Sequence, residues 1–237
     1  TPSVEFKNVS LTYSGSGAPS VEGINFKAMK GQTIGVIGGT GSGKSSLVNL
    51  IPRLYDATQG EVIVDGVNVK DYDIETLRNK VGIVMQKAVL FKGTIRENMW
   101  MGKKGATDEQ IDEALEISQS KEFVDSKQGR LDYVIEQGGK NLSGGQRQRL
   151  TIARAIVRKP DVLILDDSAS ALDFATDAAL RKAIRGMNNS PTVFIVSQRA
   201  ASLMYADLII VLDDGQVAGM GTHDELLANC EVYKEIY

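Results

Sequence analysis

The sequence predicts an α/β fold, in which a mostly parallel sheet carries helices on its faces and an α-helical segment is inserted. Three observations predict it. Short apolar runs such as 162–165 and 208–212 alternate with helix-like segments. A glycine-rich turn joins a short apolar strand that ends at Gly38 to a helix expected from Ser45 to Leu54. Residues 91–157 show helical spacing and almost no strand signal, which marks the insertion.

The strands are predicted from alternation, apolar runs and turn residues. Residues 4–9 alternate apolar and polar side chains, as in a half-buried strand, and the loop-forming residues 14–20 follow. Residues 61–64 form a strand before the turn at Asp65-Gly66. Residues 81–85 predict a buried strand ending at Gln86.

Capping residues and turn residues delimit the helices. Thr107 and Gln110 form a capping box, and the apolar face of the helix that follows includes Ile111, Ala114, Leu115 and Ser118. A second helix is expected from Ser143 to about Val157. Near the C-terminus, Asp213-Asp214-Gly215 predicts a hairpin turn, and residues 222–225 predict the cap of a last helix.

Composition is that of a folded protein and narrows the possible functions. The chain of 237 residues is 42% hydrophobic, too apolar for a disordered chain. Its net charge of −3 argues against a broad nucleic-acid surface. No apolar run reaches the roughly 20 residues of a membrane-spanning helix. Cys230 is the only cysteine, which excludes an internal disulfide and suits a reducing compartment. Because the chain begins Thr1-Pro2 without Met or a signal peptide, we expect it to be cut from something longer.

A glycine-rich segment predicts phosphate binding. Residues 38–45 read Gly-Gly-Thr-Gly-Ser-Gly-Lys-Ser and match the P-loop pattern between a strand and a helix. The alternative is an ordinary Gly-rich turn, which the strand-and-helix context disfavours. Backbone N–H groups and a helix N-terminus would face the phosphates, Lys44 would reach the β- and γ-phosphates, and Ser45 would hold Mg²⁺. The expected nucleotide ligands here are Gly39, Thr40, Gly41, Ser42, Gly43, Lys44, Ser45 and Ser46.

A carboxylate ends a later apolar strand. Residues 162–165 are followed by Asp166, and in P-loop NTPases such an Asp holds Mg²⁺. Taken alone, the pattern could equally be a buried strand with a polar end. Its place after a P-loop favours the metal role.

The second predicted helix opens on Leu142-Ser143-Gly144-Gly145-Gln146. Ser143 and Gln146 alone could be a capping box with no further role. That interpretation leaves Gly144 and Gly145 unexplained, since glycines weaken a first helical turn. They do leave backbone N–H groups open to an anion.

Together the P-loop, the LSGGQ segment and Asp166 resemble the nucleotide-binding domain of ATP-binding cassette (ABC) transporters. The resemblance covers nearly the whole chain, with the motifs in family order. It implies a P-loop NTPase core of residues 1–88 and 158–237 with an N-terminal antiparallel β part, and a helical subdomain of residues 89–157. Segments 91–98 and 221–227 resemble exporters of this family, and 170–173 match its D-loop.

The resemblance also implies roles for single residues. Tyr13 would stack on adenine, although it could instead be a core tyrosine at a strand end. Gln86 would contact Mg²⁺ with Ser45 and Asp166. Residues Ser143, Gly144, Gly145 and Gln146 would close over ATP bound to a partner domain, so that two domains enclose two nucleotides.

Two positions depart from the family pattern. Asp167 stands where the family has the glutamate that activates the attacking water, and Gln198 stands where it has a histidine that touches the γ-phosphate. The only histidine, His223, is interpreted as a solvated residue at a helix start. Both changes fall at catalytic positions, so we expect a site that binds Mg-ATP and rarely hydrolyses it.

The intact LSGGQ segment then predicts a second, non-identical ABC subunit whose ATP site is competent. The chain would be the degenerate-site half of a heterodimeric exporter, at the cytoplasmic face of the membrane, with transmembrane domains as partners and no nucleic acid. Glu136 lies one position from the family's acidic coupling residue. The alternatives are a non-hydrolytic ATP-binding regulatory module and a homodimeric soluble ABC ATPase. The transported substrate is not encoded in this segment.

Overall fold

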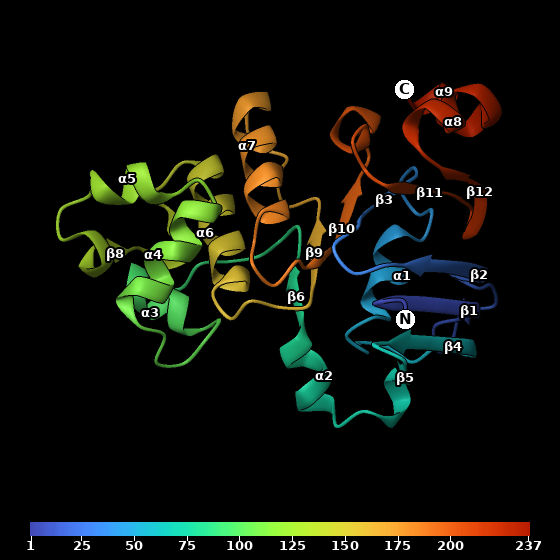
Figure 1. Cartoon of the computed structure of the whole chain (residues 1–237), viewed down its shortest axis with the longest axis horizontal. Helices are drawn as coiled ribbons and strands as arrows, with labels where there is room; N and C mark the ends of the chain where they lie inside the picture. The colour runs from blue at the N-terminus through green and yellow to red at the C-terminus, as the bar shows by residue number, and fades with distance from the viewer. The chain divides into compact units, whose positions relative to one another are not determined.

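The computed structural model describes residues 1–237, which form two compact units. The first unit comprises Thr1–Val81 and Thr192–Tyr237, and the second unit comprises Gly82–Pro191 (Figure 1). The first unit contains strands β1 (Val4–Leu11), β2 (Val21–Ala28), β3 (Thr33–Ile37), β4 (Gln59–Val64), β5 (Val67–Asn68), β10 (Thr192–Ser197), β11 (Leu208–Asp213) and β12 (Gln216–Gly221) and helices α1 (Lys44–Asn49), α2 (Ile74–Lys80), α8 (His223–Asn229) and α9 (Glu231–Ile236). The second contains strands β6 (Val81–Val84), β7 (Gly93–Thr94), β8 (Val134–Ile135) and β9 (Val162–Asp166) and helices α3 (Ile95–Trp100), α4 (Asp108–Ile117), α5 (Lys121–Asp125), α6 (Gly144–Ile156) and α7 (Phe174–Arg185).

An antiparallel sheet forms the N-terminal part of the first unit. Its strand order is β2-β1-β4-β5, and β1, β2 and β4 lie side by side in Figure 1. Phe6 of β1 pairs with Phe26 of β2, and their rings stack at 4.5 Å between centroids. Strand β2 was not predicted, although residues 24–28 alternate apolar and polar side chains. The antiparallel N-terminal part itself is confirmed.

Strand β3 carries the predicted phosphate loop at its end and is flanked on both sides by parallel strands. It pairs in parallel with β10 and with β11, while β12 returns antiparallel to β11. Residues Ile34 to Ile37 are buried, as expected for a strand covered on both faces. In the second unit β9 lies next to β6, and Val162 to Leu165 are likewise buried. The predicted mostly parallel core is confirmed.

Two element boundaries differ from the sequence prediction. Helix α1 ends at Asn49, whereas the sequence suggested Leu54. Pro52 has no N–H to continue the helical hydrogen bonds, so the chain turns there. Strand β6 ends at Val84, and the side chain of Met85 is 44% exposed, so the buried strand does not extend to Gln86.

Capping residues set the starts of the helices in the second unit. Thr107 and Gln110 form the predicted capping box of α4, whose buried face includes Ile111 and Leu115. Helix α6 has Ser143 as its N-cap and Val157 as its C-cap, which confirms the predicted span. The short pair β7 and β8 is antiparallel and was not predicted. The boundaries of a helical subdomain at residues 89 and 157 stay a prediction.

Ion pairs tie the helices of the second unit together. Arg96 of α3 binds Asp108 of α4 at 2.9 Å and also pairs with Asp132. The hydrogen bond from Arg96 lowers the pKa of the Asp108 carboxyl. Arg130 bridges Asp112 and Asp125 at 3.0 and 2.7 Å. Each pair is partly exposed, so solvent screens the attraction and its contribution to stability is small.

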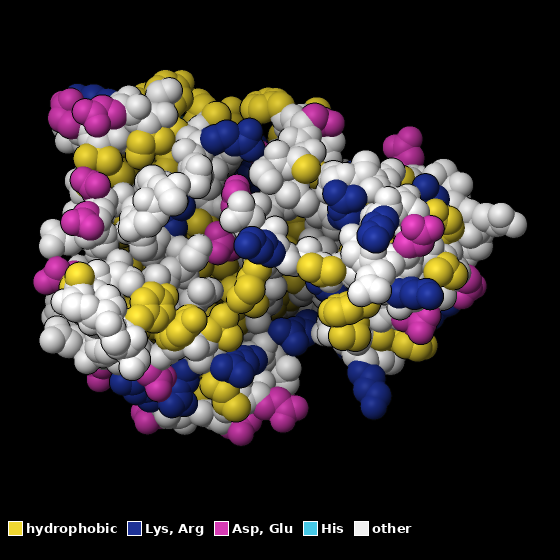
Figure 2. All heavy atoms as spheres, turned by 180° about the vertical axis from the view of Figure 1, so that it is seen from behind, with side chains coloured by type: hydrophobic (Ala, Val, Ile, Leu, Met, Phe, Trp, Pro, Cys, Tyr) yellow, Lys and Arg dark blue, Asp and Glu magenta, His cyan; other side chains and the backbone are white.

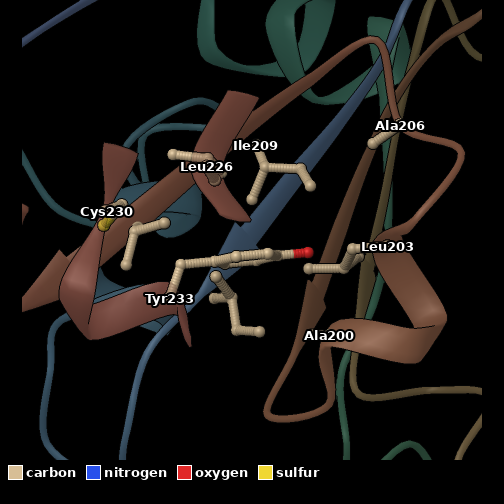
Figure 3. Close-up of a cluster of buried hydrophobic side chains, with 9 residues drawn as sticks. Ala200, Leu203, Ala206, Ile209, Leu226, Cys230 and Tyr233 are labelled. Carbon is tan, nitrogen blue, oxygen red and sulfur yellow. The ribbon is translucent and has the colours of Figure 1, made fainter. Parts of the chain in front are cut away.

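The C-terminal helices α8 and α9 pack against the rest of the first unit through Tyr233. Figure 3 shows its ring extending from α9 toward Leu203 of the 3₁₀ helix Ala200–Leu203, in a cluster that includes Ile209 and Leu226. The Tyr233 hydroxyl lies 2.6 Å from Nδ1 of His223, which is only 7% exposed. The prediction that His223 is solvated is therefore wrong, because α9 folds back and covers it.

The surface agrees with the charge balance of the sequence. On the face shown in Figure 2, acidic and basic side chains are interspersed, and no broad basic area is visible. None of the helices has the length and apolar character needed to cross a bilayer.

Candidate nucleotide-binding site

The predicted site residues form two groups, one in each unit. The first unit holds Tyr13, the P-loop 38–45 and Gln198. The second holds Gln86, the Asp166-Asp167 pair and the LSGGQ segment.

The P-loop curls around its own lysine. It runs from the end of β3 to the start of α1, and Lys44 Nζ donates to the carbonyl oxygens of Gly38 and Gly39 at 2.6 and 3.0 Å. Gly43 has φ 100°, and a Cβ there would lie 2.5 Å from the carbonyl oxygen of Ser20. Only glycine fits this turn. The loop therefore already has the tight curvature that a phosphate cradle requires, with an ammonium group at its centre.

Tyr13 is fixed beside the P-loop helix. Its hydroxyl lies 2.7 Å from Oγ of Ser46, and its ring meets Tyr55 edge-on at 4.8 Å between centroids. Tyr13 is only half-buried, which argues against a core tyrosine. The structure thus brings the predicted aromatic ligand and the predicted ligand Ser46 into direct contact.

Gln198 is exposed directly after β10. The turn that carries it is fixed by the Ser197 hydroxyl, which accepts from the backbone N–H of Arg199 at 3.0 Å. The buried residues Ala200 and Leu203 anchor the segment that follows. Gln198 is therefore held by the backbone on both sides while its amide remains free to meet a ligand.

Asp166 ends β9, and Asp167 begins the loop that follows. Asp167 has a left-handed backbone, with φ 51°, a conformation in which Asp is commoner than most residues. The next residue, Ser168, is 3% exposed and donates to the carbonyl oxygen of Val84 at 2.6 Å. No local pattern in the sequence identifies Ser168, because its partner lies 84 positions away.

The LSGGQ segment forms the start of α6. The Ser143 side chain accepts from the backbone N–H of Gln146 at 3.1 Å, and the Gln146 side chain accepts from that of Ser143 at 3.0 Å. This is the capping box that the sequence allowed, and it accounts for both side chains. Gly144 and Gly145 occupy the first turn, where helix N–H groups lack intrahelical partners.

A hollow of about 270 Å³ lies in the second unit next to the segment that includes Gln86. Gln86 is exposed two residues after β6. The hollow is lined in part by Phe91 and Met101, which are 50% and 63% exposed, and by Arg154. The Arg154 guanidinium lies 5.7 Å from the Phe91 ring centroid, and burial lowers the pKa of Arg154. The lining thus combines exposed apolar groups with two arginines, Arg154 and Arg158.

The donor set suits magnesium with a nucleotide and does not suit a protein-only metal site. No three His, Cys, Asp or Glu side chains cluster as metal ligands. The predicted ligands Ser45, Gln86 and Asp166 offer one hydroxyl, one amide and one carboxylate. Mg²⁺ commonly takes one or two protein carboxylates and completes its shell with water and substrate phosphates.

Glu136 follows β8 and is exposed. Its backbone N–H donates to Oδ1 of Asn141 at 3.0 Å, which fixes its place in the loop. Its carboxylate is accessible to a partner.

Comparison with known proteins agrees with these features. The family model described as ABC transporter matches residues 21–170, more than half of the chain. A Staphylococcus aureus protein, provisionally named a multidrug export ATP-binding/permease protein, is 38% identical over 234 residues, which are 99% of this chain and 40% of that protein. A Mycobacterium bovis protein described as an uncharacterized ABC transporter ATP-binding protein is 42% identical over 235 residues, which are 98% of this chain and again 40% of that protein.

A solved structure confirms the fold. The structure of a bacterial Atm1-family ABC exporter with ATP bound matches 99% of this chain and 41% of that chain, with a TM-score of 0.93 and 32% identity. The chain thus spans about 40% of the length of the curated relatives it matches. The chain belongs to the ABC transporter family, as an ATPase domain that binds ATP.

Proposed function

We propose that the chain is the motor domain of an ABC exporter, which binds Mg-ATP and couples it to export. The observation that carries this proposal is the P-loop closed around Lys44 between β3 and α1. The names of its relatives support the transport role, since they combine an ATP-binding part with a permease part.

In this proposal, the first group of residues binds most of the nucleotide. Tyr13 stacks on adenine, the P-loop N–H groups bind the phosphates, and Lys44 leaves its two carbonyl partners for the phosphate oxygens. Ser45, Gln86 and Asp166 hold Mg²⁺, which supplies positive charge to the phosphates when bound.

We assign low intrinsic hydrolysis to this site because of Asp167 and Gln198. The Asp167 side chain is one methylene shorter than the glutamate side chain of the family, so its carboxylate should stop more than about 1 Å short of the attacking water. A general base must lie close to the proton that it takes, so this gap should slow hydrolysis. Gln198 can hydrogen-bond a phosphate oxygen but cannot become cationic. Binding should persist, since Lys44 and Asp166 are unchanged.

The partner in this proposal is a second, non-identical ABC subunit. In a homodimer of this chain, both ATP sites would contain Asp167 and Gln198, so neither site would be competent for hydrolysis. The intact segment Ser143-Gly144-Gly145-Gln146 would instead close over ATP in the hydrolytically competent site of a different subunit.

Transmembrane domains are the other proposed partner, at the cytoplasmic face of the membrane. This chain matches about 40% of the length of its relatives, and the remaining roughly 60% is long enough to contain transmembrane domains. The hollow beside Phe91 and Met101 offers an exposed apolar rim with Arg154 for a segment of that membrane part. Its position next to the Gln86 segment would let docking influence the magnesium ligand.

The second candidate function is a non-hydrolytic ATP-binding regulatory module. Asp167 and Gln198 favour this alternative, because they replace the family's residues at both catalytic positions of the site. Turnover-dependent export by the full-length protein distinguishes the two, because a regulatory module binds ATP without driving transport.

Binding of a fluorescent ATP analogue tests the proposal directly. We expect the wild-type chain to bind it with Mg²⁺, and Lys44→Ala to weaken binding by at least tenfold, about 1.4 kcal/mol, through loss of charge-assisted hydrogen bonds. Lys92→Ala, in an exposed position outside the P-loop, is the control. Equal affinities of Lys44→Ala and wild type would refute the assignment of the P-loop.

A further inference from the structure

Gln148 links helix α6 to the loop 168–173, which follows Asp166 and Asp167. It lies one turn into the helix that opens on Ser143. Its Nε2 donates to Oγ of Ser170 at 3.0 Å, and its Oε1 accepts from the backbone N–H of Ala171 at 2.8 Å. Both ends of one amide thus bind two consecutive residues of the loop.

The same loop packs closely on the first turn of α6. A Cβ on Gly145 would lie 3.3 Å from the carbonyl oxygen of Ala171, and one on Gly144 would lie 3.6 Å from the Ala171 Cβ. Gly145 of the LSGGQ segment therefore does more than leave an N–H group open. At Gly145 the absent Cβ also leaves room for the loop that Gln148 holds in place, whereas a Cβ on Gly144 would make only an ordinary van der Waals contact.

The loop is fixed at both of its ends as well. The buried Ser168 hydroxyl donates to the carbonyl oxygen of Val84 in β6 at 2.6 Å. Asp173 accepts from the backbone N–H of Thr176 at 2.7 Å as the N-cap of α7, and this hydrogen bond lowers the pKa of its carboxyl. Gln148 supplies the middle attachment, and it is the one that leads to α6.

We infer that Gln148 is a positioning residue that joins the start of α6 and the loop 168–173 into one body. A shift of the LSGGQ turn would then move Asp166 and Asp167, and a shift of the two aspartates would move the LSGGQ turn. The inference rests on the proposed function, in which the LSGGQ turn serves a partner's nucleotide and the two aspartates serve this chain's own. Gln148 would couple the two sites without touching either nucleotide.

A purely structural role makes a different prediction. A residue that only stabilises the domain would lower its melting temperature when changed, and would leave kcat of the folded protein intact. A positioning residue lowers kcat while the KM for ATP is unchanged, because small misplacements of catalytic groups are costly and binding contacts are intact.

Gln148→Met in the full-length transporter is the main test. Met keeps a long, helix-favouring side chain but has no amide. We expect kcat for ATP hydrolysis to fall about tenfold, with KM for ATP within about twofold. Gln128→Met, the same change at an exposed glutamine outside both segments, should leave both constants unchanged.

Two further variants separate coupling from local damage. Gln148→Glu should rescue most of the rate, because a carboxylate can accept from both the Ala171 N–H and the Ser170 hydroxyl. Ser170→Ala should lower kcat less than Gln148→Met. Combining Ser170→Ala with Gln148→Met should add nothing further, since the pair acts as a unit.

Hydrogen exchange of the 237-residue chain reports the contact itself. The Ala171 amide should lose protection in Gln148→Met and keep it in Gln148→Glu. A wild-type kcat in Gln148→Met with the Ala171 amide deprotected would overturn the inference, as would additive effects of the two substitutions. The Lys44→Ala binding experiment tests the proposed function separately, because it changes the P-loop at the start of α1 and leaves Gln148 in α6 untouched.

Discussion

At the scale of single residues, Asp167 combines a short carboxylate with an unusual backbone. Its φ of 51° lies in the left-handed region, where Asp is better tolerated than Glu. The sequence could identify the missing methylene but not this conformation, which depends on the fixed loop after Asp166. The two features act on different quantities: side-chain length limits hydrolysis, and the backbone limits which residue the position accepts.

We predict that Asp167→Glu alone restores little hydrolysis, because Gln198 still lacks the charge of the family's histidine. Asp167→Glu combined with Gln198→His should restore more than the sum of the single changes, since phosphoryl transfer depends on positioning and charge together. ATPase activity should be measured in the assembled transporter, with the partner's own site inactivated and its signature set to LSGGQ. Fast turnover by the wild-type residues in that background would show that the substitutions are neutral.

At the scale of elements, the sequence predicted helix starts well, because a cap depends on residues three positions apart. The boxes at Thr107, Ser143 and Thr222 are all present. The box at Ser143 also means that its substitution has a structural cost, whatever its function. Ser143→Ala therefore cannot by itself distinguish a cap from a phosphate ligand.

Ser143→Asp makes that distinction. Asp caps a helix about as well as Ser, so the free energy of unfolding should change by less than about 0.5 kcal/mol, whereas Ser143→Ala should cost about 1 kcal/mol. If the turn binds a phosphate, the added carboxylate repels it, and ATPase activity of the assembled transporter should nearly vanish. An active Ser143→Asp transporter would leave the segment as a cap alone.

Helix α9 shows where local reasoning fails. The burial of His223 depends on Tyr233, ten positions later, and on the fold of the C-terminal helices. We predict that Tyr233→Phe destabilises the protein by about 1–3 kcal/mol, because it leaves a buried imidazole nitrogen without a partner. Urea unfolding measures the change. Tyr237→Phe is the matched control, because Tyr237 is 61% exposed and the Phe ring would still lie beside His223. An equal loss of unfolding free energy in both variants would contradict the role of the buried Tyr233 hydroxyl.

At the scale of the whole molecule, the fold class and the motif residues were predictable because they rest on local patterns. The alternation of strands and helices, the P-loop between β3 and α1, and the apolar strand before Asp166 all involve neighbouring residues. The contacts that hold the site together join distant ones. Ser168 binds Val84 across 84 positions and Gln148 binds Ser170 across 22, and no pattern in the sequence specifies such pairs.

Carboxylates bound by hydrogen bonds give the molecule a defined response to acid. Hydrogen bonds lower the pKa of the carboxyl groups of Asp56, Glu97, Asp108, Asp125 and Asp173. A carboxyl whose pKa is lower in the folded state contributes stability above its unfolded value, here 3.8 for Asp and 4.5 for Glu. That contribution is lost as pH falls through the folded pKa. Stability from these groups should therefore be constant from pH 8 to about 5 and decline below.

We predict that the urea midpoint of the wild-type chain falls steadily between pH 5 and pH 3. Asp108→Asn should be less stable than wild type at pH 7, because Arg96 loses a charged partner, and the difference should shrink as Asp108 of the wild type is protonated. Asp214→Asn, in the exposed turn between β11 and β12, should run parallel to wild type across the range. A midpoint that rose on acidification, or a gap between Asp108→Asn and wild type that widened, would show that the ion pairs of the second unit do not set the acid stability.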